Sequence, residues 1–205
     1  MINELISAVL QVFVFTLIPF MIFIYKTRSV KGFLEYIGLK KSNRRANFLA
    51  VLITLILSMP ILFLPFINHD FLVVMTNPES VSGKIRQMGL GVGTILTILI
   101  EAILKTSFAE EIFFRGFIAK RLIAITNFQL GNIIQAFIFG AIHTLLFVLI
   151  THNVFILTSI FIFTAVGAYF MTFINEKLAN GSIIPGWIAH GSANVISFIY
   201  FAFII

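Results

Sequence analysis

Two glutamates and an arginine lie within one long apolar stretch of the sequence, where ionisable side chains are rare. Glu110, Glu111 and Arg115 are surrounded there by phenylalanine, isoleucine and alanine. A charged side chain in hydrocarbon is costly, so such residues pair with one another or serve a function. In a helix, Glu111 and Arg115 are one turn apart on the same face and can pair. Glu110 points about 100° away from them, which leaves its carboxylate free for other work.

Two histidines and an asparagine occupy later apolar stretches. His143 follows Phe139 by one helical turn, and His190 precedes Asn194 by one turn. A single buried histidine is most often a structural residue. At a rise of about 1.5 Å per residue, however, these side chains reach the same layer of a membrane as Glu110. We therefore predict a shared intramembrane polar pocket.

Such a pocket holds the groups that hydrolysis needs. The Glu110 carboxylate can accept a proton from water, an imidazole can orient that water, and histidine and asparagine donors can stabilise an oxyanion. Two histidines and a carboxylate can instead bind a divalent metal such as zinc, with Glu110, His143 and His190 as ligands. The same residues could also form a proton relay in a transporter. Composition and spacing leave these three hypotheses open.

The composition requires a membrane protein. Apolar residues make up 60% and charged residues 11% of the 205 residues, against about 45–50% and about 25% in soluble domains. The absence of cysteine excludes thiolate metal sites and a cysteine nucleophile. We predict an all-α, polytopic bundle of about six transmembrane helices. The predicted spans are 5–25, 47–67, 88–121, 131–150, 154–174 and 183–205.

Basic residues orient this predicted bundle. Seven of the 14 lysines and arginines lie in the loop 26–46, which is therefore expected to be cytoplasmic. Alternation then places both termini and the loop 68–87 outside, in a multi-pass protein of the cell membrane whose pocket opens to the cytoplasm. We divide the chain into residues 1–90, with two helices and these loops, and a core at 91–205. The net charge of +6 is a topology signal and does not indicate a nucleic-acid partner.

Two further patterns predict local structure. Glu101 and Lys105 are one helical turn apart and point away from Glu110, which favours a structural ion pair between helices. The basic loop also carries Val30, Phe33, Leu34 and Ile37 at helical spacing. This spacing is consistent with an amphipathic segment on an anionic leaflet. It is equally consistent with a solvated loop that sets the topology.

Three motifs occur in order, each in a predicted transmembrane helix. They are Glu110-Glu111-x-x-x-Arg115, Phe139-x-x-x-His143 and His190-x-x-x-Asn194. Each motif alone is weak, but the ordered set closely resembles the CPBP family, the CAAX-protease and bacteriocin-processing (Abi) group of intramembrane endopeptidases. The resemblance covers about residues 95–200. The sequence contains no HExxH motif of the zincin type.

The resemblance implies a role for each matching residue. Glu110 would be the catalytic base, and His143 would help it to activate water. His190 and Asn194 would form the oxyanion hole, while the Glu111–Arg115 pair would support and orient the site. In these roles His190 presents an N–H group to the developing charge, so we expect that no metal cofactor is required. Zinc is the competing expectation.

The leading hypothesis is an intramembrane endopeptidase that hydrolyses a peptide bond in a membrane-associated protein or peptide. A CAAX-type substrate would be prenylated, and a bacteriocin-processing role would imply a bacteriocin-like peptide. The alternative is a non-catalytic bacteriocin-immunity or partner-binding membrane protein. A proton-coupled transporter is the third hypothesis.

Overall fold

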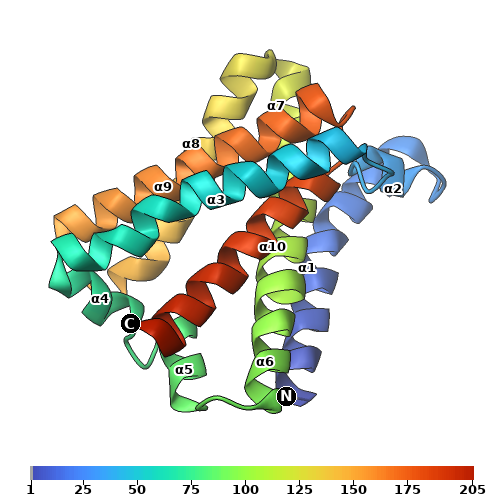
Figure 1. Ribbon diagram of the computed structural model, residues 1–205. Coiled ribbons are helices and arrows are strands. Elements are labelled where there is room, and N and C mark those ends of the chain that lie inside the picture. The colour runs from blue at the N-terminus through green and yellow to red at the C-terminus, as the bar shows by residue number, and fades with distance from the viewer. Residues whose placement is uncertain (1) are drawn as a thin grey trace.

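Six helices are long and apolar enough to cross a membrane in residues 2–205, the part of the chain that the computed structural model describes (Figure 1). These residues contain no strand, so the predicted all-α bundle is confirmed. The long helices are α1 (Ile2–Thr27), α3 (Arg44–Ile67), a third built from α6 (Val92–Leu99), η1 (Ile100–Phe108), η2 (Glu111–Ala119) and α7 (Lys120–Ile125), then α8 (Phe128–Val148), α9 (Val154–Phe173) with η3 (Ile174–Leu178), and α10 (Ile184–Ile199) with η4 (Tyr200–Ile204).

The third long helix contains wide, π-helical turns in η1 and η2. The hydroxyls of Thr106 and Ser107 each donate to the carbonyl five residues earlier, at 2.8 and 2.5 Å, as a widened turn allows. Glu110 lies at the junction of the two segments. Turns of this kind are rare and often occur at functional sites. The helix begins at Val92, later than the predicted 88, because Gly89 has a φ of 68°, which breaks the helical path.

Helix α10 packs between α3 and η1 (Figure 1). Ala50 of α3 and Ala189 of α10 belong to one buried cluster, and such small residues let membrane helices approach closely. Thr54 donates a hydrogen bond to the Ala189 carbonyl at 2.9 Å. On the other side, the Trp187 indole donates to the Ile103 carbonyl at 2.8 Å. These contacts fix α10, which carries His190.

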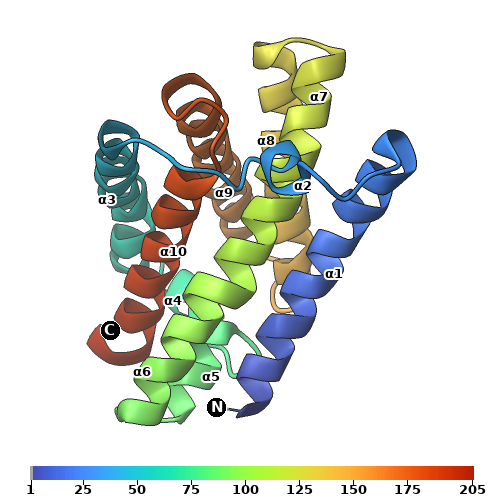
Figure 2. The same cartoon turned by 90° about the vertical axis from the view of Figure 1, so that its right-hand side faces the viewer.

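Helices α8 and α9 pack against each other as a hairpin (Figure 2), and their interface contains buried amides. Gln135 donates to the Asn132 side chain at 2.8 Å and to the Ala168 carbonyl at 3.2 Å. Asn132 in turn donates to the Tyr169 carbonyl at 3.1 Å. A Cβ at Gly140 would approach an α9 side chain to 2.9 Å. The glycine and the buried amides therefore hold the two helices close together.

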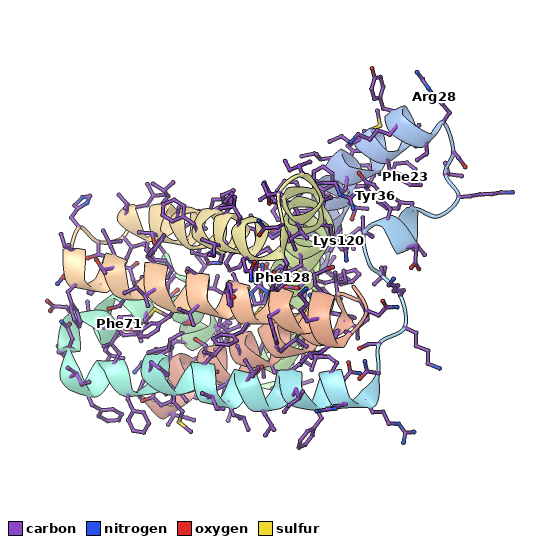
Figure 3. The ribbon with its side chains drawn as sticks, turned by 90° about the horizontal axis from the view of Figure 1, so that it is seen from above. Phe23, Arg28, Tyr36, Phe71, Lys120 and Phe128 are labelled. Atoms are coloured by element: carbon purple, nitrogen blue, oxygen red, sulfur yellow. The ribbon has the colours of Figure 1, made fainter. Side chains whose placement is uncertain are left out.

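The basic connection between α1 and α3 contains one short helix, α2 (Phe33–Tyr36). Phe33 and Ile37 are buried in a cluster with residues of α1 and η2, whereas Leu34 is exposed. The centres of the Tyr36 and Phe23 rings are 4.8 Å apart, and both side chains are labelled in Figure 3. Part of the apolar face that the sequence suggested for a lipid leaflet is thus packed against the protein.

The predicted loop 68–87 is mostly helical in the structure. It forms α4 (His69–Met75) and α5 (Val81–Gln87), whose first turns are capped by the side chains of Asn68 and Ser80. Such caps satisfy the free N–H groups of a helix start. Phe71 and Ile85 are almost fully buried. The two caps and the buried apolar residues therefore stabilise two short helices within this connection.

An ion-pair cluster joins α1 to η1. Lys105 Nζ lies 2.6 Å from Glu101 Oε1 and 3.4 Å from Glu4 Oε2 of α1. Gln11 of α1 also donates to the Lys105 carbonyl at 2.9 Å. The predicted Glu101–Lys105 pair is formed within one helix and reaches the neighbouring helix through Glu4. Helix α1 buries few of its residues, and these polar contacts add to the packing of Phe23 in the bundle.

The arrangement of the ends makes the predicted orientation testable. Both termini, α4 and α5 lie at one end of the bundle, and α2 and α7 lie at the other (Figure 1). We expect a single cysteine at exposed Lys31 to be protected from an impermeant maleimide in intact cells. A single cysteine at exposed Glu79 should be labelled. The native chain has no cysteine, so labelling has no background, and the reverse pattern would invert the topology.

Candidate active site

The structure brings four of the predicted site residues into one cluster. Glu110 comes from the third long helix, His143 from α8 and His190 from α10. Glu110 Oε2 lies 3.7 Å from His143 Nε2 and 3.8 Å from His190 Nε2. This oxygen is buried and has no hydrogen-bond partner among the described residues. Separations of this size can be spanned by a single bridging water. A carboxylate and two imidazoles thus converge as the spacing predicted.

The fourth residue, Glu111, forms a fully buried ion pair with Arg115. Arg115 Nε lies 3.2 Å from Glu111 Oε1, and the two side chains are 1% and 0% exposed. The guanidinium carbon lies 4.0 Å from the centre of the Phe139 ring, a cation–π contact. Arg115 also donates to the Met171 sulfur at 3.5 Å. The pair predicted from the i, i+4 spacing therefore ties η2 to α8 and α9.

Hydrogen-bond partners orient both imidazoles. His143 Nδ1 lies 2.9 Å from the Phe139 carbonyl, and His190 Nδ1 lies 3.3 Å from Glu111 Oε1. A carbonyl and a carboxylate only accept, so Nδ1 is the donor in each contact. Both Nε2 atoms are then directed at Glu110. Glu111 Oε1 contacts both His190 Nδ1 and Arg115 Nε. One carboxylate therefore positions an imidazole and a guanidinium.

Asn194 stands slightly apart from this cluster. Its Nδ2 donates to Thr106 Oγ1 at 2.8 Å, and Thr106 donates to the Glu101 carbonyl at 2.8 Å. Asn194 lies one turn after His190 on α10, so both face the same side. Thr106 was not among the predicted site residues. The sequence feature that could have identified Thr106 is its position one helical turn before Glu110.

A cavity of about 150 Å³ adjoins the imidazoles. It lies between α3, α8, α9 and α10, and His143, His190 and Asn194 supply part of its polar wall. Most of the remaining lining is apolar and includes Ile53, Leu57, Ile61, Phe163, Met171 and Ala193. The cavity extends along α3 and α10 toward Leu62 and Ser197. The Glu110 carboxylate does not line this cavity and lies behind the two imidazoles that do.

The donor types at Glu110, His143 and His190 match those of hydrolytic zinc sites. Each imidazole also has its Nδ1 held by a second acceptor, as metal-binding histidines do. The separations of 3.7 and 3.8 Å exceed the roughly 3.3 Å between ligands of a tetrahedral zinc with bonds of about 2.0–2.1 Å. In residues 2–205, no group of three acidic, histidine or cysteine side chains has metal-site geometry. The donors fit zinc in type, and their spacing is wider than zinc needs.

The ion pair predicts different consequences for substitution at the two adjacent glutamates. Glu111→Ala leaves the buried Arg115 guanidinium unpaired, which should cost about 3–5 kcal/mol of stability. Glu110→Ala removes a carboxylate with no direct hydrogen bond and should change stability much less. Thermal unfolding of both variants in the same detergent measures this difference. Equal unfolding temperatures would show that the Glu111–Arg115 pair does not hold the fold together.

A comparison with protein families gives a match to the region that contains the three motifs. A family model described as type II CAAX prenyl endopeptidase, Rce1-like, matches residues 92–196, just over half of the chain. The matched residues contain all three motifs and every residue of the cluster. No curated protein and no solved structure matches the chain. The chain belongs to the Rce1-like family of type II CAAX prenyl endopeptidases.

Proposed function

We propose that this chain hydrolyses a peptide bond in a membrane-associated, prenylated protein or peptide, with Glu110 as the general base. Family membership makes it a protease of the CAAX type, within a multi-pass membrane protein. The observation that carries the proposal is the buried Glu110 Oε2, which faces the Nε2 atoms of His143 and His190 across 3.7 and 3.8 Å. This is the arrangement that water activation requires.

In the first step, a water molecule between Glu110 and His143 loses a proton to Glu110 Oε2. Its oxygen attacks the carbon of the scissile carbonyl, and the carbonyl oxygen becomes an oxyanion. In the second step, Glu110 returns the proton to the amide nitrogen and the C–N bond breaks. The products are a new carboxyl terminus and a free amine, so atoms and charges balance without a covalent enzyme intermediate.

The oxyanion would be stabilised by donors on α10. Asn194 Nδ2 carries two hydrogens, of which one donates to Thr106, so the other is free for the oxyanion. His190 Nδ1 already donates to Glu111. In the oxyanion role, His190 must therefore carry protons on both ring nitrogens. Preorganised donors of this kind are among the largest contributions to catalysis of acyl transfer.

The apolar cavity supports a hydrophobic substrate. Part of its polar wall is formed by His143, His190 and Asn194, to which we assign water orientation and oxyanion binding. A cavity of about 150 Å³ is comparable with one that accommodates a benzene molecule. We infer that it takes an apolar side chain next to the scissile bond, while a longer prenyl chain extends into the surrounding lipid.

Glu110→Gln should abolish cleavage of a farnesylated CAAX peptide by purified protein. A positioned general base contributes about 10²–10⁴-fold to a rate, and glutamine cannot accept the proton of water. The matched control is Glu101→Gln, which neutralises a buried carboxylate in the same helix that pairs with Lys105. Full cleavage by Glu110→Gln would disprove the base assignment. Equal loss in both variants would point to general damage to the helix.

We further propose that hydrolysis needs no tightly bound metal. His190 serves as an oxyanion donor in the mechanism above, and a nitrogen that binds metal cannot donate a hydrogen bond. Elemental analysis of purified active protein should find less than one zinc per chain, and cleavage should continue in chelator. Loss of cleavage in chelator with recovery on adding one equivalent of zinc would reassign His143 and His190 as ligands.

A further inference from the structure

Asn175 is a fully buried asparagine beside the Glu111–Arg115 pair. It lies in η3, and its side chain is 0% exposed. Its Oδ1 accepts a hydrogen bond from the Gly186 backbone N–H at 2.8 Å. Gly186 is in the first turn of α10, one helical turn before His190. Asn175 therefore contacts the helix that carries one of the two site histidines.

This backbone contact determines which way the amide of Asn175 points. A backbone N–H can only donate, so the atom that faces it must be the amide oxygen. The Nδ2 group is then directed to the other side. It is buried and has no hydrogen-bond partner among the described residues. A buried amide donor left unpaired is costly, so an acceptor nearby is expected.

A candidate acceptor on the same side is the second oxygen of Glu111. Glu111 Oε2 is also buried and without a hydrogen-bond partner among the described residues. A Cβ placed on Gly186 would lie 2.5 Å from Glu111 Oε2 and 2.6 Å from Asn175 Nδ2. An unpaired donor and an unpaired acceptor thus face the same small space. Only glycine at position 186 leaves that space open.

The second oxygen matters because the first is already shared. Glu111 Oε1 lies 3.2 Å from Arg115 Nε and 3.3 Å from His190 Nδ1. A carboxylate held through one oxygen can still rotate about its terminal bond. A donor at the other oxygen fixes its plane. That plane sets the direction in which His190 presents Nε2 to the reacting groups.

We propose that Asn175 is a positioning residue: its Nδ2–H donates to Glu111 Oε2, directly or through one water molecule, and so fixes the carboxylate that orients His190. The proposal rests on the proposed function, because His190 acts on the oxyanion there. Gly186 is part of the same arrangement, because a side chain at this position would push Asn175 Nδ2 and Glu111 Oε2 apart.

Asn175→Asp separates positioning from a purely structural role. Aspartate keeps an oxygen for the Gly186 N–H and so retains the contact with α10, but it cannot donate to Glu111 when ionised. We expect kcat for a farnesylated CAAX peptide to fall about 10- to 100-fold, as for loss of other supporting hydrogen bonds around active sites. KM should stay unchanged, because Asn175 does not line the apolar cavity.

Asn132→Asp is the matched control. Asn132 is equally buried, but its side chain donates to the Tyr169 carbonyl in the α8–α9 interface, away from α10. Rates are compared per folded protein, measured by thermal unfolding in the same detergent. Wild-type kcat in Asn175→Asp would overturn the proposal. An equal fall in kcat in Asn132→Asp would overturn it as well, because a new buried carboxylate alone would then explain the loss.

Gly186→Ala gives an independent test if Asn175→Asp does not fold. The added methyl group occupies the space between Asn175 and Glu111, so kcat should again fall with KM unchanged, and wild-type kcat would reject the proposal. Glu110→Gln is measured in parallel. If Glu110→Gln cleaves normally, the proposed function itself is wrong. If it is inactive while Asn175→Asp and Gly186→Ala are normal, only the positioning role is wrong.

Discussion

A fully buried ion pair between Glu111 and Arg115 constrains the rest of the core. Two charges taken out of water are costly, and removal of either one would leave the other uncompensated in the interior. Around this pair, Phe139 of α8 stacks on the guanidinium, Met171 of α9 accepts from it and His190 of α10 contacts the carboxylate. Four helices must therefore meet at one point, and Glu111 at that point is the residue directly after the candidate base Glu110.

The same constraint divides the work between two adjacent glutamates. Glu111 is 0% exposed, and its carboxylate contacts both Arg115 and His190. Glu110, at the junction of two π-helical segments, is directed instead at the two imidazole Nε2 atoms. The ion pair thus supplies the rigid frame, and the neighbouring carboxylate remains available for chemistry. Preorganisation of this kind is what a hydrolytic site requires.

Features that depend on spacing within one helix could be predicted from the sequence. Apolar runs indicated six spans, and the i, i+4 separation of Glu111 and Arg115 predicted their pairing. The depth of the polar residues also predicted that Glu110, His143 and His190 converge, but other contacts between distant segments could not be predicted. The hydrogen bond from Asn194 to Thr106 and the convergence of Asn175 and Glu111 on Gly186 depend on how α10 packs. The two short helices in residues 68–87 depend on local caps, which a hydropathy pattern does not register.

The proposed function depends on Glu110, which would activate the water that cleaves a membrane-associated substrate. The most direct test compares, by mass spectrometry, the new peptide termini in membranes of cells that express the wild-type chain or Glu110→Gln at equal levels. If Glu110 is the general base, new termini in membrane-associated proteins should be present with the wild-type chain and missing with the variant. Identical sets of termini in the two membranes would contradict it.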